Sequence, residues 1–372
     1  MGERNNPLMK KLDKWIGCPL LFVLGLFHKK RSVKDIKNTI NPQIAIIKTA
    51  GIGDTIVLSA IVDEIKSEYP DSRITWICAA NNLGMVNALK YKGIDEVFCF
   101  EMKSPIKSFK AISSFGTFDY VLDFAPWARI NAVISWALSG KFKAGFKRKN
   151  MYRHYVYDAW AEHLDTQHEM DNYRAVLQLS GFVLKKLNPD LRKNAPAVIK
   201  GNYAVLQMQA GGASTKMRQW GNENWAELAK ILYKQYGYRI LFSGSSDDVD
   251  YVNEVIDKLK NDSILVENIA GKYTLAQMAN VLQYAKLVVS VNTGIMHYAA
   301  SMNVPLVALH GATSELRWGP LSDNAIVVKS GEDCQPCISL GAETKCCDPR
   351  CMQNITVSMV ANAVQRLLNV KI

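Results

Sequence analysis

The feature that most constrains this chain is the alternation of short apolar runs with helical patterns. Residues 43–48 (QIAIIK) form an unbroken apolar run, which is typical of a parallel strand buried on both faces. After a glycine-containing loop, apolar residues recur at helical spacing from Ile56 until Pro70 ends the pattern. Crossovers of this length predict a parallel sheet with helices on both faces. The further strands predicted for this sheet are residues 73–79, 96–100 and 120–124.

The same alternation restarts in the second half of the chain. Residues 186–202 are rich in Pro, Asn and Lys and have no clear periodicity, so we expect the inter-domain linker there. A length of 372 residues also suits two domains better than one. The sequence therefore predicts an α/β protein with two Rossmann-like domains, whose parallel sheets face a shared cleft. Beyond the linker we expect strands at 203–208, 238–242, 287–291 and 305–310, and helices at 222–236, 247–259, 274–284 and 294–302.

The formal charge of +11 is concentrated in two places. Residues 1–40 carry nine Lys or Arg against three Asp or Glu, and residues 141–153 carry six cations and no acid. Such patches attract anionic lipids, phosphorylated glycans or nucleic acid, although each alone is also compatible with a merely solvated basic face. No RNA- or DNA-binding motif is present, so we expect no nucleic-acid partner.

Residues 15–27 form an apolar run of 13 between Lys14 and the basic string 28–31. The run is short for a transmembrane helix and lacks a signal-peptide cleavage site. We expect residues 10–31 to lie on a membrane surface with their cations at anionic headgroups. The alternative is an apolar helix packed on the protein's own core.

Three loops between a strand and a helix carry the candidate chemistry. Residues 51–54 (GIGD) resemble a dinucleotide fingerprint, but Ile56 stands where its third glycine should be. Asp54 is then either a helix N-cap or a catalytic carboxylate at the cleft edge. Residues 210–220 combine small residues, hydroxyls and cations, which suits either a diphosphate cradle or a flexible basic loop. The loop at 291–297 places the start of a helix where it can meet anionic oxygens.

The motifs resemble glycosyltransferase family 9, the lipopolysaccharide heptosyltransferases, from about residue 43 to 369. The strongest blocks are IIKTAGIGDTIVLSAI at 46–61 and VSVNTGIMHYAA followed by VPLVALHGATSELRWGP, within about residues 290–320. GAS…RQW with NENWAELA, and the weaker AGFKR and HEMDNY, occur in the family's order. The resemblance implies the GT-B fold, an ADP-heptose donor and a lipopolysaccharide acceptor.

The resemblance also implies roles for individual residues. Asp54 falls on the family's catalytic base. Arg218 stands where the family usually has a Lys that contacts the donor phosphates, and Asn292 stands where it usually has Asp. That last departure puts the sugar specificity in doubt. The implied donor site consists of Ser214, Lys216, Arg218, Asp248, Tyr273, Asn292, Thr293, Gly294 and His297, and we assign acceptor binding to Gly53, Lys147 and Arg148.

These expectations combine into one hypothesis. The protein is an inverting, metal-independent glycosyltransferase that moves a sugar, expected to be heptose, from an ADP-linked donor to an anionic lipid-linked glycan. It works as a peripheral protein on the inner face of the cytoplasmic membrane. A non-catalytic sugar-nucleotide-binding scaffold and a nicotinamide-dependent enzyme are the alternatives. The expected segments are 1–40 (membrane-associating), 41–190 (acceptor domain), 200–355 (donor domain) and 356–372 (C-terminal helix).

Five cysteines lie between residues 334 and 351, and two of them have CxxC spacing. This spacing and number suit a tetrahedral structural zinc site, in a loop that otherwise lacks a core. Free or partly oxidised thiols are the alternative. The cysteines are Cys334, Cys337, Cys346, Cys347 and Cys351.

Overall fold

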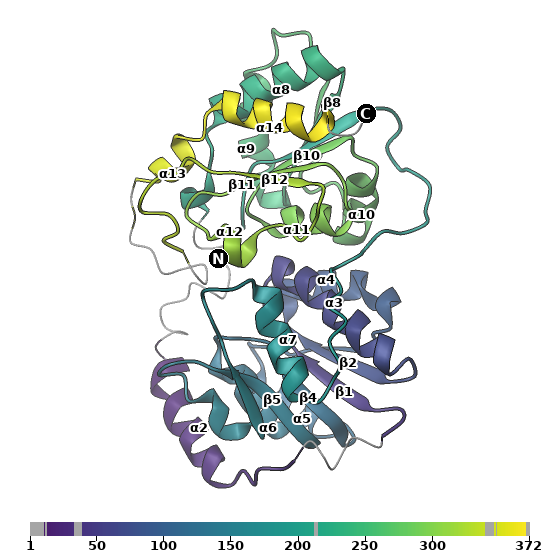
Figure 1. Ribbon diagram of the computed structural model, residues 1–372, viewed down its shortest axis with the longest axis vertical. Helices are drawn as coiled ribbons and strands as arrows, with labels where there is room; N and C mark the ends of the chain where they lie inside the picture. Colours follow the sequence, from purple (N-terminus) through teal and green to yellow (C-terminus); the bar gives the residue numbers. More distant parts are fainter. Residues whose placement is uncertain are drawn as a thin grey trace. The chain divides into compact units, whose positions relative to one another are not determined.

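The computed structural model divides the chain into two compact units, Met1–Leu187 and Asn188–Ile372. It describes residue 11 and residues 13–32, 39–211, 215–338, 346 and 348–369. Each unit holds one six-stranded sheet in which every strand pair is parallel (Figure 1). Among the described residues, no helix has both the length and the apolarity needed to cross a bilayer.

The first sheet has the strand order β3-β2-β1-β4-β5-β6. Its central strand β1 is an almost fully buried run whose Ile44 pairs with Ile74 of β2 and Tyr120 of β4. One face packs on α5 and α6, where Ala45 and Ile47 share a core with Ile112 and Ile134. The elements of this unit are α2 (Gly17–Leu26), β1 (Gln43–Ile47), α3 (Ile52–Glu68), β2 (Arg73–Cys78), α4 (Ala80–Ala88), η3 (Lys90–Lys92), β3 (Glu96–Cys99), α5 (Pro105–Ile112), β4 (Phe118–Asp123), α6 (Arg129–Ala137), β5 (Gly140–Lys147), η4 (Arg153–Val156), β6 (Ala159–Glu162) and α7 (Glu169–Leu179).

The second sheet has the order β12-β11-β10-β7-β8-β9. Its core is formed with α8, α9 and α14, which lie on one face of the sheet, and it buries Trp220 and Trp225 edge to face. The elements of this unit are β7 (Tyr203–Gln207), η5 (Lys216–Arg218), α8 (Asn222–Tyr236), β8 (Arg239–Ser243), η6 (Ser246–Asp248), α9 (Val249–Asp257), β9 (Val266–Asn268), α10 (Leu275–Gln283), β10 (Leu287–Val291), α11 (Gly294–Ser301), β11 (Leu306–Leu309), α12 (Glu315–Trp318), β12 (Ala325–Val328), α13 (Arg350–Gln353) and α14 (Val357–Asn369).

Both sheets have a point where the strand order reverses. In the first unit the chain moves from β1 outward to β3 and then returns to β4, on the other side of β1. In the second unit it moves from β7 outward to β9 and returns to β10, on the other side of β7. Loops at the carboxyl ends of such strands diverge and leave room for a ligand. The topology therefore points to β1/β4 and β7/β10 as the places where functional side chains should gather.

Candidate functional site

Asp54 belongs to a group of three polar side chains at the carboxyl end of β1. Its Oδ1 accepts hydrogen bonds from Lys48 Nζ at 2.7 Å and from the Tyr173 hydroxyl at 3.2 Å. Lys48 Nζ also donates to the Tyr173 hydroxyl at 2.8 Å. An ammonium group this close stabilises the negative charge of the carboxylate. The arrangement therefore fixes one oxygen of Asp54 and orients the carboxyl group.

The reversal point of the first sheet is bridged by Lys48, the first residue after β1. Its ammonium donates at 3.2 Å to the carbonyl oxygen of Phe124, which follows β4. The side chain is only 2% exposed, so it makes these bonds without competition from bulk water, whereas the Asp54 side chain is 15% exposed. The ammonium is thus buried while the carboxylate still reaches solvent.

The turn before Asp54 requires a glycine. Gly51 has φ +87°, and a Cβ built there would lie 2.1 Å from Asp54 Oδ2. Thr55 closes the turn by donating its hydroxyl to the Gly51 carbonyl oxygen at 2.7 Å. Gly51 therefore admits the backbone conformation and leaves the space that the carboxylate occupies.

The fold gives most cations of the basic run at 141–153 partners from outside the run. Lys143 is buried and donates to the carbonyl oxygens of Ser135, Trp136 and Leu138 at the end of α6. Arg153 is buried and bonds Asp123 at 2.5 Å. These two cations are structural, because both are buried and bond groups within the unit.

The two proposed acceptor contacts from that run are more accessible. Lys147 pairs with Glu162 at 2.7 Å, and Arg148 lies 3.5 Å from Asp165 with its guanidinium over the ring of Trp127. Both side chains are at least partly exposed, at the carboxyl end of β5. Exposed ion pairs of this kind are weak and exchange readily with another anion. Gly53, the third proposed contact, lies in the first turn of α3.

In the second unit, Arg218 bridges the reversal point. Its Nη1 donates to the carbonyl oxygen of Asn292 after β10, and its Nη2 donates to that of Gly211 after β7, both at 3.0 Å. The guanidinium is therefore held between the two diverging loops by backbone atoms. It lies beside the first residues of α11, whose free N–H groups favour a negative charge.

The start of α11 is capped by Thr293, whose Oγ1 accepts from the N–H of Ile295 at 3.0 Å. Gly294 is the first residue of the helix. His297 is buried, and its ring packs edge to face on Trp318 at 6.4 Å. The structure thus places Thr293 and Gly294 at the helix start that sequence indicated, whereas His297 faces the packed interior next to Trp318.

Asn292, the departure from the family pattern, has a buried side chain that points inward. Its Nδ2 lies 3.2 Å from His310 Nε2 and donates to the carbonyl oxygen of Trp318 at 3.2 Å. Burial lowers the pKa of His310 to about 4, so its imidazole is neutral at physiological pH and its Nε2 accepts from the amide. The side chain at 292 therefore makes internal contacts, and its backbone oxygen faces Arg218.

The remaining donor residues follow neighbouring strands. Lys216 is exposed in η5 after β7, and Tyr273 is half-buried after β9. Asp248 follows β8, where its Oδ2 accepts from both the N–H and the hydroxyl of Ser245 at 2.7 Å. Ser214 lies outside the described residues. Apart from the inward-facing side chains of Asn292 and His297, the described donor residues therefore follow the carboxyl ends of the neighbouring strands β10, β7, β8 and β9.

The cysteine-rich loop leaves the zinc expectation undecided. Cys351 is buried, and its pKa is raised to about 11 by burial and by the nearby thiols of Cys337, Cys334 and Cys346. Among the described residues, no group of three or more possible ligands is arranged to hold a metal ion. Cys347 and residues 339–345 lie outside the described part of the chain. The described thiols alone thus do not form a metal site.

Sequence reasoning missed four residues of these groups: Lys48 and Tyr173 beside Asp54, and His310 and Trp318 beside Asn292. Lys48 was visible as a cation that ends an apolar strand directly before a glycine turn. Tyr173 lies in α7, which is 119 residues from Asp54 in the chain, so nothing local in the sequence connects the two. His310 likewise follows a strand end.

Comparisons with known proteins identify the family of this chain. The profile of glycosyltransferase family 9 (heptosyltransferase) matches residues 115–347, which is more than half of the chain. The chain belongs to glycosyltransferase family 9. Family 9 relatives include lipopolysaccharide heptosyltransferase 2 of Escherichia coli K12, which is 35% identical over 113 residues, covering 30% of this chain and 32% of the relative. The core heptosyltransferase OpsX of Haemophilus influenzae is 23% identical over 354 residues, covering 87% and 96%.

The structure of E. coli ADP-heptose lipopolysaccharide heptosyltransferase II superposes with a TM-score of 0.71 at 20% identity, covering 88% of this family 9 chain and 99% of that chain. This likeness confirms the GT-B fold. The chain spans only about a third of the length of the heptosyltransferase 2 relatives that it matches from E. coli, H. influenzae and Salmonella typhimurium.

Proposed function

We propose that this family 9 protein transfers heptose from ADP-heptose to a lipopolysaccharide core or a related anionic lipid-linked glycan, with inversion and without a catalytic metal ion. The observation that carries the proposal is the pair of sites at the two reversal points. One presents an oriented carboxylate and the other presents a cation beside a helix start. The donor is supported by the structural neighbour, an ADP-heptose transferase, and the acceptor by the relatives, which are lipopolysaccharide heptosyltransferases.

Asp54 is the general base of the proposed reaction. It takes the proton of the acceptor hydroxyl as that oxygen forms a bond to the anomeric carbon. The bond from the anomeric carbon to the diphosphate oxygen breaks at the same time, and its electron pair leaves with ADP. Attack from the face opposite the leaving group inverts the anomeric centre. Lys48 and Tyr173 hold Asp54 Oδ1 throughout, and base catalysis of this kind contributes about 10²–10⁴-fold.

The second unit handles the charge of the leaving diphosphate. Arg218 is already oriented by two backbone carbonyls, and the N–H groups at the start of α11 lie beside it. Lys216 is exposed after the same strand. Preorganised cations and dipoles stabilise charge that develops during bond breaking. In this proposal, these groups stabilise the negative charge of the leaving diphosphate, which a metal ion stabilises in other transferases.

The two alternatives fit the structure less well. Asn292 was the observation that favoured a non-catalytic scaffold. Its side chain, however, bonds His310 and the carbonyl oxygen of Trp318 and points away from the donor site. A nicotinamide enzyme needs a third glycine where buried Ile56 packs in α3. We propose Lys147 and Arg148 as acceptor contacts; the Lys147 pair with Glu162 is exposed and exchanges with anionic groups, and the Arg148 side chain is partly exposed beside it. We place the protein at the cytoplasmic face of the inner membrane.

The structural zinc at the cysteine-rich loop stays a prediction, and no step of the reaction depends on it. Elemental analysis of purified protein should find about one equivalent of zinc, and a chelator should lower the thermal stability. Protein that contains no metal, with thiols that titrate freely, would exclude it.

A donor screen tests the proposed function. The protein is incubated with ADP-heptose, UDP-sugars and GDP-sugars, with and without a heptose-deficient lipopolysaccharide acceptor, and the release of nucleotide and the mass of the acceptor are measured. We expect ADP release that depends on the acceptor and an acceptor heavier by one heptose. Turnover of a UDP- or GDP-sugar in preference to ADP-heptose would refute the donor assignment. Binding of ADP-heptose without transfer to any acceptor would favour the scaffold.

A further inference from the structure

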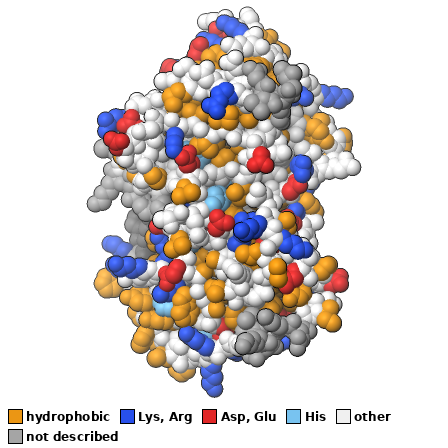
Figure 2. All heavy atoms as spheres, viewed as in Figure 1, with side chains coloured by type: hydrophobic (Ala, Val, Ile, Leu, Met, Phe, Trp, Pro, Cys, Tyr) orange, Lys and Arg blue, Asp and Glu red, His pale blue; other side chains and the backbone are white. Residues whose placement is uncertain are grey.

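The helix α2 and its flanks expose a continuous apolar face. The helix carries no charged residue from Gly17 to Leu26, and the side chains that point to solvent are apolar. Figure 2 shows hydrophobic side chains gathered at the lower left, where Figure 1 draws α2. Exposed apolar patches of this kind mark interaction surfaces. The large exposed side chains are Trp15, Ile16, Leu20, Phe22, Val23, Leu26 and Phe27.

The opposite side of α2 is packed tightly on the first unit. Leu21 is fully buried in a cluster with Ala132 of α6 and Val156 of η4. A Cβ at Gly17 would lie 2.8 Å from Arg129 Cδ, and one at Gly25 would lie 2.7 Å from Tyr155 Cβ. The two glycines therefore allow close contact along the helix. This contact fixes which residues of α2 face outward.

Polar contacts tie both ends of the helix to the same unit. Before it, Asp13 forms an ion pair with Arg129 at 2.6 Å. After it, His28 Nε2 lies 3.0 Å from Asp158 Oδ1, which also accepts from the backbone N–H of Arg31 at 2.8 Å. The helix thus lies along the surface of the unit and is an integral part of it. Deleting residues 1–40 would uncover part of the core, so such a deletion is not a clean test of this face.

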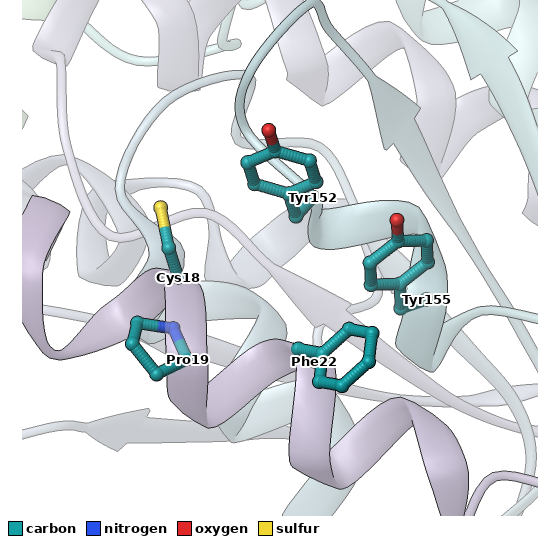
Figure 3. Close-up of a pocket in the computed structure, with 5 residues that line it drawn as sticks. All are labelled: Cys18, Pro19, Phe22, Tyr152 and Tyr155. Atoms are coloured by element: carbon teal, nitrogen blue, oxygen red, sulfur yellow. The ribbon is translucent and has the colours of Figure 1, made fainter.

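A hollow with almost entirely apolar walls continues the face beside the helix. Figure 3 shows Cys18, Pro19 and Phe22 on α2, with Tyr152 and Tyr155 on the segment opposite. The rings of Phe22 and Tyr155 meet edge to face at 6.2 Å. Tyr152 has φ +59°, a backbone conformation unusual for a bulky residue, and its side chain is exposed. The apolar surface therefore extends from the helix onto η4.

We propose that this face binds the surface of an anionic phospholipid bilayer, with α2 lying in the plane of the membrane. The ten residues of α2 span about 15 Å, half the thickness of a hydrocarbon core, so the helix can lie in the interface but cannot cross it. Exposed cations stand at both ends, Lys11 and Lys14 before the helix and Lys29 after it, where they meet lipid phosphates. Aromatic residues, Trp15 and Phe27, also stand at both ends, as is typical at membrane interfaces.

The charge at the ends selects a bilayer over a second copy of this positively charged chain as the occupant. The proposal of a membrane-binding face depends only on the contacts, exposure and charges of α2 and its flanks. The face would also hold the unit that contains Asp54 at the membrane, where a lipid-linked acceptor lies; this further role rests on the proposed function. Membrane binding and sugar transfer can therefore fail independently.

Vesicle co-sedimentation of the full-length protein tests the proposal. The vesicles are phosphatidylethanolamine with phosphatidylglycerol, or phosphatidylcholine alone. The variant Phe22→Asp/Leu26→Asp places two charges on the exposed face, and Leu265→Asp, at a site 61% exposed in the second unit, is the matched control. We expect the parent and the control to bind the anionic vesicles more than the neutral ones. The double variant should bind at least about tenfold less, while its melting temperature and its ADP affinity stay those of the parent.

Three results would overturn the proposal. The first is equal binding of the double variant and the parent, and the second is a parent that stays in the supernatant with anionic vesicles. The third is a dimer in lipid-free solution that the double variant dissociates, which would identify a second copy as the occupant. If the double variant unfolds, Trp15→Gln/Phe27→Gln, at two sites that are 74% exposed, gives the same comparison.

Discussion

Arg218 is held in place by backbone atoms, so its removal should affect charge rather than folding. Arg218→Ala should weaken ADP binding by at least about tenfold and slow transfer as well, because the diphosphate is charged both before and after bond breaking. Arg218→Lys keeps the charge but loses the two-pronged contact with the carbonyls of Gly211 and Asn292. Its ADP affinity and transfer rate should therefore lie between those of the parent and of Arg218→Ala. Calorimetric titration with ADP and the measured kcat and KM check this. Unchanged ADP affinity in Arg218→Ala would remove Arg218 from the donor site.

Asn292 gives a second prediction at the scale of one side chain. Asn292→Asp restores the acid usual in the family, but it places the carboxylate against His310. A carboxylate there should raise the pKa of His310 from its present value of about 4, because it stabilises the imidazolium. The KM for the donor should change less than threefold. Titration of the imidazole by NMR and donor kinetics measure the two effects. A large change in donor KM with an unshifted pKa would mean that the side chain reaches the sugar.

The site was only partly predictable from sequence at this scale. Asp54, Thr293 and Gly294 follow strand ends, and that position is visible in a local pattern. The partners of Asp54 and Asn292 come from elements that are distant in the chain, and only the fold brings them together. The partners of the cations at 141–153 were hidden for the same reason, since Arg153 in η4 bonds Asp123 at the end of β4.

At the scale of elements, Lys143 links β5 to α6. Its ammonium caps three carbonyl oxygens at the end of α6, so Lys143→Met should destabilise the protein by about 2–4 kcal/mol at pH 7. Burial and the charge of Arg31 lower the pKa of Lys143 to about 8 in the folded state, against 10.5 as its ordinary value. Between these values the unfolded chain binds more protons, so this lysine adds stability as the pH rises from about 8 to about 10.

The stability difference between the parent and Lys143→Met should therefore grow with pH, by at most about 3 kcal/mol. Urea unfolding at pH 7.5 and pH 10 measures it. Lys141→Met is the matched control, because Lys141 is on the same strand and its side chain is 56% exposed. An equal difference for Lys143→Met at both pH values would contradict the account of its buried ammonium.

The strands of the two sheets were predictable where they are apolar and central. The expected segments 43–48, 73–79, 203–208 and 287–291 match β1, β2, β7 and β10 to within one residue. β5 was missed because its lysines were interpreted as a basic patch, although Phe142, Ala144 and Phe146 alternate as in a strand. The edge strands β6, β9 and β12, of three or four residues each, were also missed.

At the scale of the whole molecule, the same design occurs in both units. Each sheet reverses its strand order at a central pair, and a cation bridges the two diverging loops there: Lys48 in the first unit and Arg218 in the second. In the first unit the cation orients a carboxylate, and in the second it stands beside a helix start. We propose that the two sites perform different parts of one transfer reaction, with acceptor activation in the first unit and donor binding in the second.

The most direct test of that claim is the rate of heptose transfer by Asp54→Asn, measured together with its ADP-heptose affinity. Asparagine has the size of the carboxyl group, but it removes the negative charge beside the buried ammonium of Lys48, so we expect stability to fall by about 1–3 kcal/mol while the variant still folds. The account predicts donor affinity equal to that of the parent and a transfer rate lower by about 10²-fold or more. A variant that transfers heptose at nearly the parent rate would show that Asp54 only pairs with Lys48 and Tyr173, and it would contradict the mechanism.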